Sequence, residues 1–191
     1  PDYAVTGVQT CALPIYDLGG VYTNRGEWHA AAQAYVRAVD LRPDYALSYL
    51  NLGVAFENLG DSEQAERGYQ RALECDPQLA AAAASLATLY EKDNRLDEAE
   101  KFVQAALSLN AMDPVANLTR AQLDIRAGSH REAVNRLEAQ LQQPLSPRNR
   151  SLTASRLGAA YDKLGDYDAA FAAFITAKEA LKTGNSIEGG V

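Results

Sequence analysis

The sequence predicts an all-α protein, a solenoid of about five antiparallel helix pairs, and three observations support this prediction. First, alanine recurs every 34 residues, at Ala31, Ala65, Ala99 and Ala133. Second, each interval holds two apolar runs with the i, i+3, i+4 spacing of an amphipathic helix. Third, a Gly or an Asn separates the two runs, as expected where one helix ends and the next begins. One helix pair cannot bury its apolar face alone, so successive pairs must stack.

The repeating units are expected at about 12–45, 46–79, 80–113, 114–150 and 151–183. The fourth unit has three extra residues in its connection, 142–150, where two prolines oppose helix continuation. The last residues, 184–191, are polar and glycine-rich. We expect them to form a flexible tail or a truncated continuation.

Within a unit, particular residues predict the local structure. Gly60 and Asn94 stand at turns that need a left-handed backbone, which Gly adopts freely and Asn tolerates. Asp61 and Asp166 follow such turns, where N-caps are expected. Small residues at 53, 65 and 72 let two helices approach closely, and aromatic residues at 56 and 69 are expected to fill the space between successive pairs.

The second unit carries a complete set of marks: Leu52-Gly53, Phe56, Gly60, Ala65, Tyr69, Ala72 and Pro77. With its counterparts over residues 16–183, this pattern resembles the tetratricopeptide repeat (TPR) family. The third unit has Ala87, Asn94 and Val103 at three of the marked positions. The fourth departs most, with Arg120 and Asp124 at apolar positions and Gln140 at a small one. The resemblance implies a right-handed TPR superhelix.

The first residues do not share the repeat pattern. Residues 5–15 read VTGVQTCALPI, which looks like the codon-by-codon translation of a widely used sequencing-library adapter. We therefore expect residues 1–15 to be non-native, from a metagenomic bacterial fragment, and exclude them from fold reasoning. A cytoplasmic location is slightly favoured, although an export signal upstream of Tyr16 would not be visible.

Composition restricts the classes of function. Eighteen basic and 25 acidic residues give a formal net charge of −7, which does not favour nucleic-acid binding. No apolar run approaches the roughly 18 residues of a membrane span. The sequence contains no catalytic motif, and His29 and His130 are too far apart in a solenoid to cooperate. Cys75 lies near a helix end and is expected to pack rather than react. We expect no enzyme activity, cofactor or metal in this fragment.

The resemblance also implies where a ligand would bind. In TPR proteins the first helices of successive repeats line a concave groove that binds peptides or partner proteins. By position, this groove would contain Leu47, Leu50, Asn51, Val54, Asn58, Ala81, Ala84, Ser85, Thr88, Lys92, Leu118 and Gln122. Asn51 occupies a place where related proteins often hold a ligand backbone, although asparagine is also simply common there. The carboxylate-clamp subtype is not expected, since Ala81 and Ser85 replace its basic residues.

Three roles remain open. The first is a scaffold that binds a peptide or a partner protein, with an oligomeric state that the sequence does not reveal. The second is the N-terminal TPR part of a larger bacterial enzyme, such as a TPR-containing sulfotransferase. The third is a periplasmic or lipid-anchored assembly factor.

Overall fold

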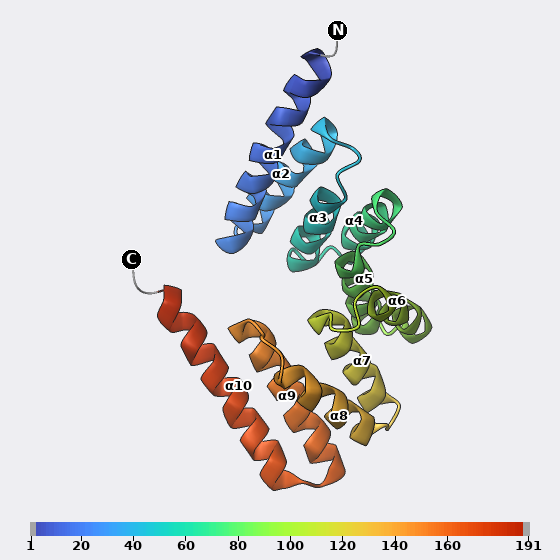
Figure 1. Cartoon of the computed structure of the whole chain (residues 1–191), viewed down its shortest axis with the longest axis vertical. Coiled ribbons are helices and arrows are strands. Elements are labelled where there is room, and N and C mark those ends of the chain that lie inside the picture. Colours follow the sequence, from blue (N-terminus) through green and yellow to red (C-terminus); the bar gives the residue numbers. More distant parts are fainter. Residues whose placement is uncertain (1–2, 189–191) are drawn as a thin grey trace. The chain divides into compact units, whose positions relative to one another are not determined.

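The described part of the chain folds into ten α-helices and contains no strand. The structure, a computed structural model, describes the backbone of residues 3–188 and the side chains of residues 12–182. The helices are α1 (Tyr3–Asn24), α2 (Trp28–Leu41), α3 (Ala46–Asn58), α4 (Ser62–Cys75), α5 (Ala80–Lys92), α6 (Leu96–Leu109), α7 (Pro114–Arg126), α8 (His130–Leu141), α9 (Pro147–Leu164) and α10 (Tyr167–Glu188) (Figure 1). Short connections join them in pairs, which confirms the predicted all-α solenoid of helix pairs.

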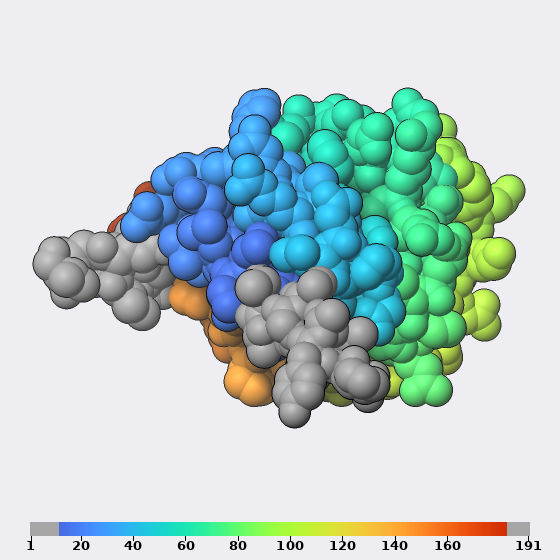
Figure 2. Space-filling view, turned by 90° about the horizontal axis from the view of Figure 1, so that it is seen from above, coloured from blue at the N-terminus to red at the C-terminus, as the bar shows by residue number. Residues whose placement is uncertain are grey.

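Two compact units divide the chain, one ending at Leu89 and the other beginning at Tyr90. In the first unit, α1 packs on α2, α2 on α3 and α3 on α4. The space-filling view shows these helices as adjacent bands, from blue to green (Figure 2). In the second unit, the consecutive helices from α6 to α10 pack in the same way. Each of these helices thus contacts its neighbours in sequence, as a solenoid requires.

The turns between paired helices have the backbone that the sequence predicts. Gly60 has φ of 81°, and Asn94, the one described non-glycine residue with positive φ, has 60°. The Asp61 carboxylate accepts a hydrogen bond from the Gln64 amide at 3.1 Å, and Asp166 caps α10 in the same way through Ala169. Both predicted N-caps are therefore confirmed.

The fifth pair begins earlier than predicted. Helix α9 starts at Pro147 rather than at 151, because Ser146 caps it by accepting a hydrogen bond from the Asn149 amide at 3.2 Å. Proline fits the first turn of a helix, where its missing N–H is not needed. At the chain ends, part of the expected non-native segment 1–15 and part of the expected tail 184–191 lie outside the described residues, although α10 itself continues to Glu188.

The paired helices approach closely where a glycine on the first faces an aromatic ring on the second. A Cβ added to Gly53 would lie 2.6 Å from the Tyr69 ring, and the same geometry joins Gly19 to Tyr35. The pair Gly158 and Phe174 repeats it at 2.7 Å. Where alanine replaces this glycine, the opposite residue is aliphatic, as in Ala121 and Leu137 of one core cluster. In these pairs, glycine on the first helix therefore faces an aromatic ring on the second, and alanine faces a smaller aliphatic side chain.

The two aromatic residues expected between successive pairs both contact a neighbouring pair. Phe56 packs against the cluster that contains Ala31 and Tyr35. The Tyr69 ring lies on Gly53 of its own pair, and the Tyr69 hydroxyl bonds to Ser85 of the next pair. The period of the sequence placed Tyr69 on a buried face, but it did not show that the ring would rest on the glycine of its own pair.

We expect the substitution Ala65→Leu to lower the free energy of unfolding by about 1–3 kcal/mol through overpacking. Ala65 is fully buried, and its carbonyl oxygen lies against Gly53 of the partner helix. Urea denaturation followed by circular dichroism measures the change. Ala105→Leu, at an exposed alanine of α6, is the matched control and should have little effect. Equal stabilities for the two variants would contradict the close approach of α3 and α4.

Candidate functional site

In the first unit, Asn51 of α3 contacts Tyr16 of α1. The Asn51 side-chain amide donates a hydrogen bond of 2.9 Å to the Tyr16 hydroxyl. The Tyr16 ring is in turn held by two other rings, with centroid distances of 5.2 Å to Tyr45 and 5.7 Å to Tyr35. The Arg42 guanidinium lies 4.9 Å from the centre of the Tyr45 ring. Sequence reasoning singled out Asn51 but missed this aromatic cluster.

The Asn51–Tyr16 pair retains hydrogen-bonding capacity. Burial raises the pKa of Tyr16, and the neighbouring tyrosines add to the effect, so the phenol is protonated at neutral pH. Among the described residues, neither the Tyr16 hydroxyl hydrogen nor the Asn51 Oδ1 has a further partner. Both residues are half-buried. The pair therefore offers one donor and one acceptor, which is the complement of a peptide group.

The other predicted groove residues of the first unit differ in accessibility. Leu47, Asn58 and Ala81 are exposed, whereas Val54, Ser85 and Thr88 are half-buried. Leu50 and Ala84 are buried, so their side chains present little surface to a ligand. The helical repeat gives the face on which a residue lies, but it does not give its depth below the surface.

Several of these polar groups are bonded within the chain. The Asn58 amide donates to the Val54 carbonyl at 2.8 Å, and the Thr88 hydroxyl to the Ala84 carbonyl at 3.0 Å. The Ser85 hydroxyl bonds to Tyr69. Asn51, with Leu47 beside it, is therefore the predicted residue of this unit best placed to engage a ligand.

The predicted residues of the second unit do not form a comparable site. Leu118 packs against the core cluster around Leu137, and Gln122 is half-buried. Lys92 is exposed at the end of α5. A cleft of about 340 Å³ lies elsewhere in this unit, between the connection before α7 and the connection after α8. Its lining includes Met112, Asn117, Arg136, Gln140, Pro144 and Leu145.

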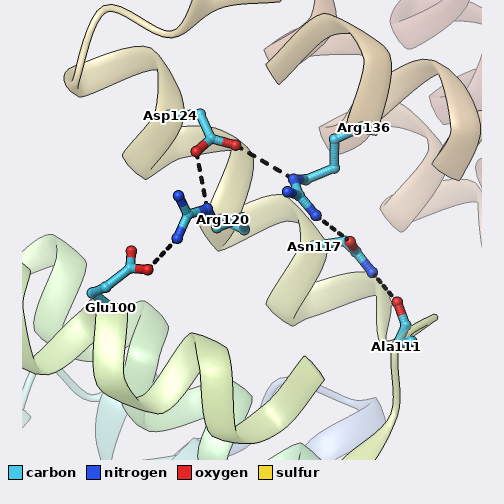
Figure 3. Close-up of polar contacts among 6 residues, drawn as sticks. All are labelled: Glu100, Ala111, Asn117, Arg120, Asp124 and Arg136. Atoms are coloured by element: carbon cyan, nitrogen blue, oxygen red, sulfur yellow. Dashed lines mark hydrogen bonds and ion pairs between the residues drawn. The ribbon is translucent and has the colours of Figure 1, made fainter. Parts of the chain in front are cut away.

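The fourth helix pair contains a network of charged and polar residues (Figure 3). The Asp124 carboxylate is buried and accepts from Arg120 at 2.9 Å and from Arg136 at 3.4 Å. Arg120 also pairs with Glu100 of α6. Arg136 donates to the Asn117 side chain at 3.2 Å, and Asn117 donates to the Ala111 carbonyl at 2.9 Å. The two charged residues that break the apolar pattern of this repeat are therefore each other's partners.

The described histidine and cysteine side chains, which could act in catalysis or bind a metal, do not form a cluster. His29 is exposed, and His130 is half-buried with its Nδ1 unpaired among the described residues. The Cys75 thiol lies 3.5 Å from the Pro43 carbonyl. Within the described range, no three His, Cys, Asp or Glu residues are grouped so as to hold a metal ion. None of the described helices combines the length and the apolar character that crossing a bilayer requires.

Repeated helix pairs of matched geometry define an α-solenoid repeat protein. Family models identify the repeat: "TPR repeat" matches residues 19–60, and "tetratricopeptide repeat" matches residues 46–79, 69–101 and 155–180. The chain therefore contains tetratricopeptide repeats, and the resemblance noted in the sequence is confirmed for these ranges.

Solved structures show the same fold at low sequence identity. A chain of the APC/C hetero-tetramer Cut9–Hcn1 is 18% identical, with a TM-score of 0.85 over 88% of this chain, which spans only 33% of that chain. TTC0263, a thermophilic TPR protein of Thermus thermophilus, is 19% identical, with a TM-score of 0.75 over 88% of this chain and 91% of that chain.

A third structure, YrrB, is described as a TPR protein with an unusual peptide-binding site. It is 19% identical, with a TM-score of 0.59 over 88% of this chain and 86% of that chain. No curated protein sequence is significantly similar to this chain. These likenesses show the fold of the chain, which is that of TPR solenoid proteins.

Proposed function

We propose that this chain is a scaffold for protein interaction and that it binds an extended peptide segment of a partner protein around Asn51 and Tyr16. The observation that carries the proposal is the pair itself, which presents an acceptor and a donor, both unpaired among the described side chains, beside the exposed Leu47. A peptide backbone supplies one N–H and one C=O per residue and would use both groups. An apolar side chain of the ligand would contact Leu47.

The aromatic cluster supports this use of the pair. The Tyr16 ring is fixed by the rings of Tyr35 and Tyr45, so its hydroxyl is preorganised before a ligand arrives. The Tyr16 hydroxyl in turn orients the Asn51 amide, which leaves the Asn51 carbonyl oxygen as the acceptor for a ligand. A TPR protein of related fold, YrrB, is described by its peptide-binding site.

Selection from a random peptide library on the immobilised chain, followed by fluorescence polarisation with a selected peptide, tests the proposal. We expect the double variant Asn51→Ala/Leu47→Glu to weaken binding by about tenfold or more, as for a residue at the centre of an interface. Leu47 is chosen because it is exposed, whereas a charge at the buried Leu50 would disturb folding.

The matched control is Asn135→Ala/Leu109→Glu, which makes the same changes at exposed positions of α8 and α6. The control should bind the peptide like the unmodified chain. If the Asn51→Ala/Leu47→Glu variant binds equally well, the site lies on another face. If no peptide is enriched, the chain does not bind peptides and the proposal is wrong.

A further inference from the structure

Helix α10 exposes an apolar face that its counterparts bury. Phe171 is 69% exposed and Phe174 is 44% exposed. The residues that correspond to Phe174 in α2 and α8 are Tyr35 and Leu137, and both are fully buried. A following first helix packs on each of those two helices, α3 on α2 and α9 on α8, whereas the described residues contain no helix after α10. The exposed face of α10 therefore resembles the faces of α2 and α8 on which the first helix of the next pair packs.

Helix α1 exposes the complementary surface. Leu18 and Val21 are 45% and 44% exposed. Their counterparts in α3, Leu52 and Ala55, are buried against the second helix of the preceding pair. In α9 the corresponding residues, Leu157 and Ala160, are buried in the same way against α8. The exposed face of α1 thus resembles the faces of α3 and α9 that pack on the second helix of the preceding pair.

The residues at these junctions are matched in chemical character. Between α2 and α3, Ala32 and Leu52 share a core cluster, and between α8 and α9, Val134 and Leu157 do so. Between α6 and α7, the same two positions carry an ion pair, Glu100 and Arg120. The remaining junction is mixed, since Glu66 and Leu86 occupy these positions. The exposed residues at the corresponding positions of α10 and α1 are Phe171 and Leu18, both apolar.

We propose that α10 of one copy of this chain stacks on α1 of a second copy, with Phe171 against Leu18 and Phe174 beside Val21. Between two copies, this contact has the same form as the contact that α2 and α3 make within one copy. Because it joins two different surfaces, it is heterologous and produces a closed ring or an open filament. This contact shares helix α1 with the peptide site through Tyr16, but Asn51 and Leu47 take no part in it.

Sedimentation velocity of the full chain over a range of concentrations tests the proposal. The unmodified chain should increase in mean mass with concentration. We expect Phe171→Glu and Leu18→Arg each to weaken self-association by about tenfold or more, because each places a charge against an apolar surface. Both residues are exposed in a single copy, so the variants should fold, and circular dichroism verifies this. Leu109→Glu, an exposed leucine of α6, is the control and should associate normally.

Two further samples distinguish this contact from a symmetric one. A mixture of the Phe171→Glu and Leu18→Arg chains retains one intact α10 surface and one intact α1 surface, so it should form at least a complex of one copy of each variant. The double variant Phe171→Glu/Leu18→Arg places an acidic side chain of one copy opposite a basic side chain of the next, as in the ion pair between Glu100 and Arg120. It should regain association that weakens as salt is added.

Three results would overturn the proposal. The unmodified chain could remain monomeric at every concentration. The Leu18→Arg chain could associate as strongly as the unmodified chain, which would indicate pairing of two α10 helices. The mixture of the two single variants could remain monomeric. The peptide-site variant Asn51→Ala/Leu47→Glu should associate normally, so failure of either proposal can be recognised separately.

Discussion

Substitution of Asp124 by Ala should lower the free energy of unfolding by about 3 kcal/mol. This carboxylate is buried and accepts hydrogen bonds from both Arg120 and Arg136 (Figure 3). Removing one member of a buried ion pair leaves its partners uncompensated, which costs about 3–5 kcal/mol. The lower end applies because the Arg120 and Arg136 side chains are each about a third exposed and can recover some hydration. Urea denaturation with an extrapolation to water measures the change.

The matched control for this prediction is Asp162→Ala, which removes the same carboxylate from an exposed position of α9. Its effect should stay within about 0.5 kcal/mol. The double variant Arg120→Leu/Asp124→Phe restores the apolar residues that the other repeats carry, such as Leu52 and Phe56. It should be more stable than Asp124→Ala, because apolar packing can replace a buried ion pair without loss. Equal stability of Asp124→Ala and Asp162→Ala would contradict the structural role of the network.

Only part of this network could be predicted from the sequence. Arg120 and Asp124 are recognisable as departures from the repeat, because the period places them where other units have Leu and an aromatic residue. Their spacing of four also permits a pair on one helix. The remaining members, Glu100, Asn117 and Arg136, come from three helices. Period alone cannot select them from the many other polar residues.

The fold was predictable because its signals are local. The turns at Gly60 and Asn94 and the caps at Asp61 and Asp166 depend on a few adjacent residues, and each has the predicted form. The early start of α9 at Pro147 also had a local signal, the preceding serine, which the prolines obscured.

The candidate site was predicted only in part. Asn51 follows from its position in the repeat, but its partner Tyr16 lies on another helix, 35 residues away. The contact depends on how α1 and α3 are placed around α2, and no spacing in the sequence encodes it. For the same reason, the helical period places Leu50 and Ala84 on the predicted groove face although both are buried. Depth is set by the neighbouring helices and not by the helical period.

Truncation of Tyr69 to Ala should lower the free energy of unfolding by about 3–5 kcal/mol, the usual cost of deleting a buried aromatic ring. Tyr69 is fully buried with its ring on Gly53, and its hydroxyl donates to Glu57 at 2.6 Å. Burial, together with the Glu57 carboxylate, raises the pKa of Tyr69 and keeps this hydroxyl a donor. Tyr69→Phe is the control, since it keeps the ring and loses the hydrogen bonds of the hydroxyl to Glu57 and Ser85, of which the bond to the charged Glu57 is worth about 1.5–3 kcal/mol.

A double-mutant cycle with Gly53 tests whether ring and glycine are matched. Gly53→Ala alone should destabilise the chain by about 1–3 kcal/mol, because the new Cβ would lie 2.6 Å from the Tyr69 ring. In the Tyr69→Ala background the clash with the ring is absent, and only the approach of the new Cβ to the Ala65 carbonyl oxygen, 3.1 Å, remains. The alanine preference of helices, about 0.5–1 kcal/mol, then offsets much of the cost. Gly53→Ala should therefore cost clearly less in this background than in the unmodified chain, and denaturation curves of the four proteins measure the difference.

Gly20→Ala separates this clash from the general preference of helices for alanine. Gly20 lies inside α1, and a Cβ there would meet no atom within 4 Å. The substitution should stabilise the chain with or without Tyr69. If Gly53→Ala behaved like Gly20→Ala in the unmodified chain, the ring would not rest on Gly53. The size matching seen at Ala121 and Leu137 would then have a different origin.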